Sequence, residues 1–150
     1  GSQFALTIQN NGTTNVIDPF WVEVYINPFA PPTSVNQAWN DLAQFGMVWG
    51  IDKRLLPLSP GESVTLGIYD SYYRPEISQL PSAFTPGTNF YAQVDSVDTS
   101  STFGGVLEIH EVIGGSYNNI FGPVTNPVDS GPLTGNEGGG ELPGGVPDRP

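Results

Sequence analysis

Apolar side chains recur at every second residue in several short stretches of this chain, a spacing typical of β-strands with one buried face. The clearest stretch is FWVEVYIN, residues 20–27, in which two sets of side chains alternate. The first set is Phe20, Val22, Val24 and Ile26, and the second is Trp21, Glu23, Tyr25 and Asn27. Similar alternation predicts further strands within residues 3–9, 47–51, 63–69, 89–97 and 106–112.

Glycine and proline separate these stretches and leave room for helix in only two places. The chain has 19 glycines and 15 prolines, a composition that suits short strands joined by turns. Within residues 28–46, three apolar residues at helical spacing predict one short helix with Ser34 as its N-cap and Gly46 just after its last turn. Pro75 predicts a single helical turn.

The order of these elements predicts an all-β fold. About six or seven short strands with turn signals between them, and no repeated βαβ unit, indicate an immunoglobulin-like antiparallel β-sandwich with short helical insertions. We expect residues 1–121 to form this sandwich. Residues 122–150 are dominated by proline and glycine and carry few large apolar side chains, so we expect an extended C-terminal tail or linker without a core of its own.

The charge of the chain argues against two classes of partner. Fifteen acidic residues against four basic ones give a net charge of -11, and such a surface repels nucleic-acid phosphates and anionic lipid headgroups. No apolar run approaches the roughly 18 residues of a membrane span, so we expect neither nucleic-acid binding nor membrane insertion. A chain that is acidic and lacks cysteine fits many bacterial exported proteins, which predicts an extracellular or cell-surface location.

Four motifs, taken in order, resemble the bacterial cell-adhesion-related domain (CARDB), an immunoglobulin-like sandwich of surface and secreted proteins. LTIQNNG resembles its strand with a V-x-N-x-G turn, FWVEVYIN the next strand, LSPGESVTL its L-x-P-G-E turn and strand, and YAQVDS with GGVLEIHEVIGGSYNN its last segments. The resemblance spans residues 3–121. That family usually begins with a further strand of the P-D-L-x-V kind, which is not found here, so we expect an open sheet edge or groove.

Acidic and amide side chains gather near the ends of predicted strands. Calcium accepts carboxylate, amide and carbonyl oxygens. The candidate ligands are Asp95, Asp98, Glu108, Glu111, Asn118 and Asn119. No compact loop spaces these oxygens for one ion, and an asparagine pair also suits a turn, so a structural turn is the stronger interpretation. We therefore predict no cofactor, with calcium as the open alternative.

Neither a zinc site nor an active site is indicated by the motifs. Zinc needs three or four convergent ligands, whereas His110 is the only histidine, and a strand over residues 106–112 would place only Glu108 beside it. Pairs of carboxylates are expected by chance in so acidic a chain, and no G-x-S-x-G motif locates a nucleophile. We expect a protein that is not an enzyme.

Two sets of residues are candidates for contacts with partners. Trp21 and Tyr25 share what we predict to be the outward face of their strand, where they could stack on sugar rings, form a protein interface or cap the sandwich. The second set consists of apolar residues of the tail, Val124, Val128 and Leu133. In addition, Asn11 begins a glycosylation sequon, Asn-Gly-Thr, in a predicted exposed turn.

These expectations combine into one hypothesis of function and one alternative. The first is a non-enzymatic structural or adhesive module that self-associates as a subunit of a bacterial surface filament, with subunits linked by strand or tail complementation. The alternative is an accessory module of a larger secreted protein that binds calcium or polysaccharide.

Overall fold

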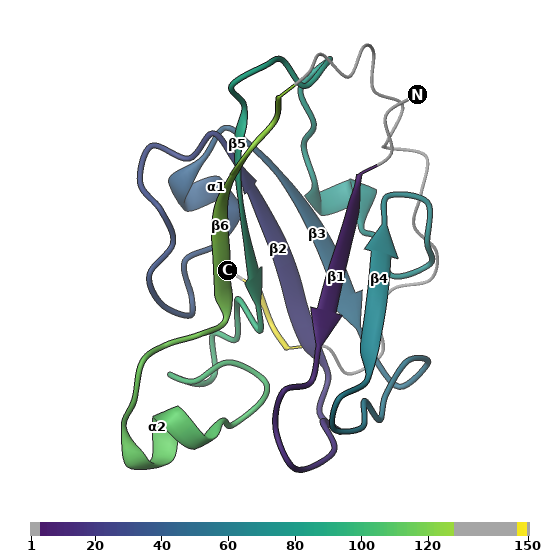
Figure 1. Cartoon of the computed structure of the whole chain (residues 1–150), viewed down its shortest axis with the longest axis vertical. Coiled ribbons are helices and arrows are strands. Elements are labelled where there is room, and N and C mark those ends of the chain that lie inside the picture. The colour runs from purple at the N-terminus through teal and green to yellow at the C-terminus, as the bar shows by residue number, and fades with distance from the viewer. Residues whose placement is uncertain (1–3, 128–146, 150) are drawn as a thin grey trace.

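Two antiparallel β-sheets face each other in the computed structural model, which describes residues 4–127 and 147–149 (Figure 1). The larger sheet has the strand order β3-β2-β5-β6, and the smaller sheet pairs β1 with β4. The strands are β1 (Ala5–Gln9), β2 (Phe20–Ile26), β3 (Phe45–Ile51), β4 (Ser63–Gly67), β5 (Asn89–Val94) and β6 (Ile120–Thr125). The protein is therefore an all-β sandwich, as the alternating stretches predict.

Within the described ranges, three short helical elements connect the strands. They are α1 (Trp39–Leu42), the 3-10 turn η1 (Pro75–Ile77) and α2 (Ile109–Ile113). The η1 turn starts at Pro75, which confirms the helical turn predicted there. Within the described residues, no helix is both long and apolar enough to cross a membrane.

Strand β2 lies at the centre of the larger sheet and is buried on both faces. It pairs with β3 on one side and β5 on the other, and all seven of its residues are buried. One face packs against the smaller sheet in a core that contains Phe20, Val22, Val24, Ile26, Met47, Trp49, Ile51 and Leu66. The other face packs in a second cluster with Trp21, Tyr25, Ala38, Trp39, Val48 and Val97. The larger sheet thus has an inner face, toward β1 and β4, and an outer face covered by α1 and loops.

The helix predicted before β3 is shorter than expected. Its N-cap is Ala38 instead of Ser34, and Gly46 lies inside β3 instead of after the helix. The backbone N–H of Ser34 instead donates to Gln37 Oε1 at 3.1 Å, which forms a turn. Gly46 is part of the β2–β3 pairing and lies under the ring of Trp39, where a Cβ atom would overlap it. The pairing of Gly46 with β2 therefore ends the helix earlier than the spacing of the apolar residues predicts.

The strand predicted over residues 106–112 is wrong, because this segment contains α2. The side chain of Glu111 accepts the backbone N–H of Glu108 at 2.7 Å, and a reciprocal bond completes a capping box at the start of the helix. Ile109, Val112 and Ile113 are exposed, so the apolar residues of this helix do not pack in the core. Local capping decides the structure here, and Glu108 and His110 do not share a strand face.

The sandwich extends beyond the predicted boundary at Phe121. Strand β6 continues to Thr125 and pairs with β5, where Thr125 lies opposite Asn89 and Val124 opposite Phe90. The first residues assigned to the tail therefore belong to the larger sheet. At the other end of the tail, Pro147 and Arg149 contact the outer face of that sheet.

Candidate functional site

The open side of the sandwich is an apolar groove between β1 and the edge formed by β5 and β6. Its volume is about 510 Å³. In Figure 1 it lies between the purple β1 and the green β6, with β2 behind it. The residues opposite β1 are Val24 of β2, Phe90, Ala92 and Val94 of β5, and Ile120 and Phe121 of β6. An extended apolar segment would find a hydrophobic surface here.

The groove runs along an unpaired backbone edge of β1. Every residue from 4 to 9 lines it, and within the described part of the chain β1 pairs with β4 alone. Asn10 donates its N–H to Glu62 O in register with β4. Because antiparallel strands alternate between bonded and non-bonded pairs, the N–H groups of Ala5, Thr7 and Gln9 point to the groove side. The edge can therefore pair with one more strand.

Strand β6 forms the opposite wall but is a poor edge for pairing. It contains Pro123, which has no N–H to donate, and Gly122 at a φ of 135°. Its register with β5 is also interrupted between Phe90 and Ala92. An incoming strand would therefore pair with β1 and pack its side chains against β5 and β6.

Exposed apolar side chains are found at the groove and also on α2. Phe121 is 68% exposed on β6, and Val124 is 45% exposed on the same strand. On and next to α2, Leu107, Ile109, Val112 and Ile113 are all exposed. Monomeric proteins keep such patches small, and larger ones mark interaction surfaces. Exposed apolar side chains therefore occur both on the wall of the groove and on the α2 segment.

A group of acidic side chains lies between α2 and the end of β5. Asp95 is buried, and its two carboxylate oxygens accept the backbone N–H groups of Gly105 at 2.7 Å and Val106 at 2.9 Å. Burial raises the pKa of Asp95 to about 7, although these two hydrogen bonds act in the opposite direction. Glu108 and Glu111 add to the rise because their negative charges are near. The carboxylate of Asp95 thus holds the 104–106 loop in place.

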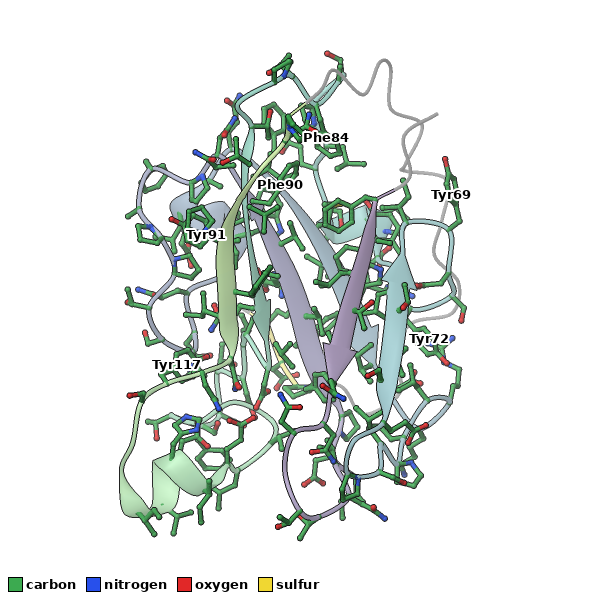
Figure 2. All side chains as sticks on the ribbon, in the orientation of Figure 1. Tyr69, Tyr72, Phe84, Phe90, Tyr91 and Tyr117 are labelled. Carbon is green, nitrogen blue, oxygen red and sulfur yellow. The ribbon has the colours of Figure 1, made fainter. Side chains whose placement is uncertain are left out.

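His110 lies between two glutamates of the same segment. Its Nδ1 is 3.1 Å from Glu108 Oε2, and its Nε2 is 3.6 Å from Glu111 Oε1. Its ring packs edge-on against Tyr117, which Figure 2 labels near the lower end of β6, above α2. Burial raises the pKa of Glu108 above its ordinary value. These contacts stabilise the helix locally and do not form a strand face.

The structure brings together only part of the predicted calcium ligands. Asp95, Glu108 and Glu111 are close enough to influence one another, whereas Asp98 accepts hydrogen bonds from Ser100 in a separate turn. Asn118 and Asn119 line the groove. Among the residues that the structure describes, no three histidine or acidic side chains form a group able to hold a metal ion. Calcium binding stays a prediction that this geometry does not strengthen.

The outer face of the larger sheet buries a charged residue, Glu23. Its side chain is inaccessible to solvent, and its Oε2 accepts the backbone N–H of Trp39 at 2.6 Å. Its Oε1 forms an ion pair with the guanidinium of Arg149, which also lies 5.2 Å from the ring centroid of Trp21. Burial raises the pKa of Glu23, and the charge of Arg149 opposes that rise. The C-terminal segment thus closes a charged site on this face.

The expectation that Trp21 and Tyr25 point outward to a partner is wrong. Trp21 is 7% exposed and Tyr25 is fully buried, because α1 and the C-terminal segment cover their face of β2. The hydroxyl of Tyr25 lies 2.5 Å from Gln37 O and 2.8 Å from Gln93 Oε1. With α1 and the C-terminal segment in place, neither side chain is exposed on the surface.

The remaining predicted residues have different outcomes. Asn11 is exposed in the turn after β1, as expected, and lies at the rim of the groove. Val124 lies exposed on β6, where a neighbouring molecule can reach it. Val128 and Leu133 lie outside the described residues.

Sequence reasoning missed the pair of Glu23 and Arg149. The signal was present, because Glu23 is the one charged residue in β2 and stands between Trp21 and Tyr25. A charged residue among large apolar ones on a central strand needs an internal partner if both faces are buried. Arg149 is one of only four basic residues, but 126 positions separate it from Glu23, and nothing in the pattern links them.

Comparison with known proteins gives no relative for this chain: no family model, no curated protein and no solved structure matches it. The resemblance to the CARDB family and the immunoglobulin-like connectivity therefore stay predictions. Function has to be argued from the groove, the exposed apolar surface and the buried charged site.

Proposed function

We propose that this protein is a non-enzymatic structural or adhesive subunit that self-assembles outside the cell or at its surface. In this proposal each copy accepts an extended segment of a second copy in the groove between β1 and β6. The observation that carries the proposal is the coincidence of an apolar groove with an edge of β1 that has no proline and no strand partner among the described residues.

Two kinds of interaction support an extended segment in this groove. The N–H groups of Ala5, Thr7 and Gln9 offer ladder hydrogen bonds to an added strand. The apolar side chains of β5 and β6 offer burial to alternate residues of that strand. Recognition by strand addition uses this combination, in which the backbone gives affinity and the side-chain pockets give specificity.

The donor in this proposal is the tail of a second copy. Val128 and Leu133 are the first two large apolar residues that follow β6 in sequence, and they would occupy the groove of the neighbour. A contact between a groove and a tail is heterologous, because the two surfaces differ. Such contacts do not have to close and can propagate into a filament.

The first experiment blocks the edge of β1. Thr7→Pro removes the central N–H on the groove side, while the bonds of β1 to β4 come from alternate residues and remain. The matched control is Thr65→Pro, because Thr65 lies directly opposite Thr7 and its N–H points away from β1. Sedimentation velocity and electron microscopy should show assemblies for the wild type and Thr65→Pro but monomers for Thr7→Pro.

The second experiment tests the donor. Val128→Asp together with Leu133→Asp places charges in the proposed donor segment and should reduce assembly as strongly as Thr7→Pro does. If the wild type stays monomeric at high concentration, or if Thr7→Pro assembles as the wild type does, the proposal is wrong. Assembly that is lost in Thr7→Pro but kept in the tail variant would contradict the tail as donor.

A further inference from the structure

The last described residues of the chain occupy a socket on the outer face of the larger sheet. We define the socket by Trp21, Glu23, Trp39, Thr99 and Gly105, and the arm as residues 147–149. Trp21 Nε1 donates to Pro147 O, and Thr99 N donates to Asp148 O at 3.3 Å. The guanidinium of Arg149 pairs with Glu23 and lies over the ring of Trp21. Each residue of the arm therefore has a specific partner.

The charge of Glu23 requires a cation in this socket. The carboxylate is fully buried, and the N–H of Trp39 satisfies only Oε2. A buried carboxylate without a counter-charge is strongly unfavourable, so Oε1 needs the guanidinium. An arginine fits better than a lysine, because its planar group can pair with a carboxylate and stack on an aromatic ring together.

The shape of the socket also fits the arm. A Cβ atom at Gly105 would lie 2.5 Å from Pro19 O and 2.7 Å from Pro147 Cγ, so a glycine here allows both the strand-end backbone and the proline of the arm to approach the loop closely. Asp95 fixes the same loop through hydrogen bonds to the N–H groups of Gly105 and Val106. The loop therefore has a defined position against which a proline packs.

The arm makes its contacts as a short peptide ligand would. Its three residues bind through one ion pair, one stacked ring and two hydrogen bonds, and the sequence between β6 and the arm is residues 126–146. Those contacts are the same whether the arm comes from the same chain or from another. When extended, the chain between residues 128 and 146 can reach up to about 65 Å.

We infer that the socket is a binding site for the Pro-Asp-Arg arm of a second copy, exchanged for the arm of the same chain upon assembly. This inference rests on the proposed function. If the tail of one copy enters the groove of a second copy, residues 147–149 at the end of that tail are brought close to the socket of the second copy. The groove then binds the apolar part of the tail, and the acidic socket binds its basic end.

Cross-linking between two different variants tests the exchange, and the absence of cysteine from the chain keeps the background low. Thr99 and Asp148 are exposed, and their backbones are in contact. T99C and D148C are placed in separate full-length chains, which are mixed under assembly conditions and oxidised. The matched control pairs D148C with T65C, an exposed position on the smaller sheet. A disulfide-linked dimer should form several-fold more efficiently with T99C, and adding E23Q to the T99C chain should reduce its yield.

Three results separate this inference from the proposed function. A dimer yield at the level of the control, while the wild type assembles, would overturn the exchange and leave the groove contact standing. A cross-linked dimer that also forms in the Thr7→Pro background would support the socket and contradict its dependence on the groove. If neither assembly nor the cross-linked dimer is observed, both are overturned.

Discussion

The two faces of the larger sheet differ in whether their binding surfaces are open or covered. The inner face leaves an apolar groove open beside β1, whereas the outer face closes over Glu23 with a segment from the far end of the chain. Both regions involve the same central strand, since Val24 lies in the groove and Glu23 in the socket. Figure 2 shows the same division on β5, where Phe90 and Tyr91 extend to opposite sides.

The difference follows from the cost of leaving each surface without a partner. Apolar surface exposed to water costs about 25 cal/mol per Å², so a groove can stay open with a modest loss. A buried charge without a partner costs several kcal/mol, so the socket needs an occupant in every state of the protein. The groove on the inner face can therefore stay empty until a second molecule binds. The socket on the outer face needs an arm at all times, so the arm of the same chain can be replaced only by the arm of another copy.

Removal of the arginine from the socket should have the largest effect on stability. Arg149→Ala leaves Glu23 buried and unpaired, and we expect the free energy of unfolding to fall by about 3–5 kcal/mol at pH 7. Urea denaturation followed by tryptophan fluorescence measures this change. The exposed Lys53→Ala is the control and should change stability by about 0.5 kcal/mol or less.

The pH dependence of Arg149→Ala identifies Glu23 as the cause. Burial raises the pKa of Glu23 above its ordinary value of 4.5, so the folded variant prefers the protonated acid. The loss of stability should be small below pH 4.5 and grow as the pH rises toward 7. Adding Glu23→Gln should recover much of the loss. A variant as stable as the wild type at pH 7 would show that the arm does not compensate this charge.

The alternation of apolar side chains explains which strands could be predicted from the sequence. Strands β2, β3 and β5 were predicted because alternate apolar side chains of each pack in the core on the inner face of the sheet, which gives the period of two. The period does not reveal whether one face or both are covered, and this led to the error on Trp21 and Tyr25. Large aromatic residues on the second face of β2 were the available signal for burial on both sides.

The alternation of apolar residues did not predict α2, β6 or the wall of the groove. The α2 helix depends on the capping box of Glu108 and Glu111, which competes with an alternating pattern of similar length. Strand β6 contains Gly122 and Pro123, which are typical of a tail and lie here at a sheet edge. An open sheet edge or groove was anticipated, but the residues of β6 that form the wall of the groove were not.

The second-largest effect should come from Asp95, which supports the wall of the socket. Its pKa of about 7 lies above the ordinary value of 3.8, so the folded state holds a proton that the unfolded chain has lost between these values. Its contribution to stability is complete below pH 3.8 and is lost as the pH rises through 7, with a slope of at most about 1.4 kcal/mol per pH unit.

Replacing this carboxylate should flatten the pH profile. Asp95→Asn is expected to lower the slope of unfolding free energy between pH 5 and pH 8, although the amide oxygen can accept only one of the two N–H groups and the amide NH2 cannot accept the other. Thermal unfolding at several pH values measures the slope. Asp98→Asn, in the neighbouring turn, is the control for removing one negative charge. Equal slopes in the wild type and Asp95→Asn would contradict the assignment of this titration to Asp95.

The smallest effect on stability is expected on the open inner face. Phe121→Ser removes an exposed side chain from the groove wall, so the free energy of unfolding should change by about 0.5 kcal/mol or less. Assembly should nevertheless weaken, because the same side chain would be buried against the added segment. Phe29→Ser is the control, since Phe29 is similarly exposed but does not line the groove. If both variants assemble equally well, the groove wall does not contribute to the contact. If only Phe121→Ser loses assembly while its stability is unchanged, the inner face is a surface kept for a second molecule.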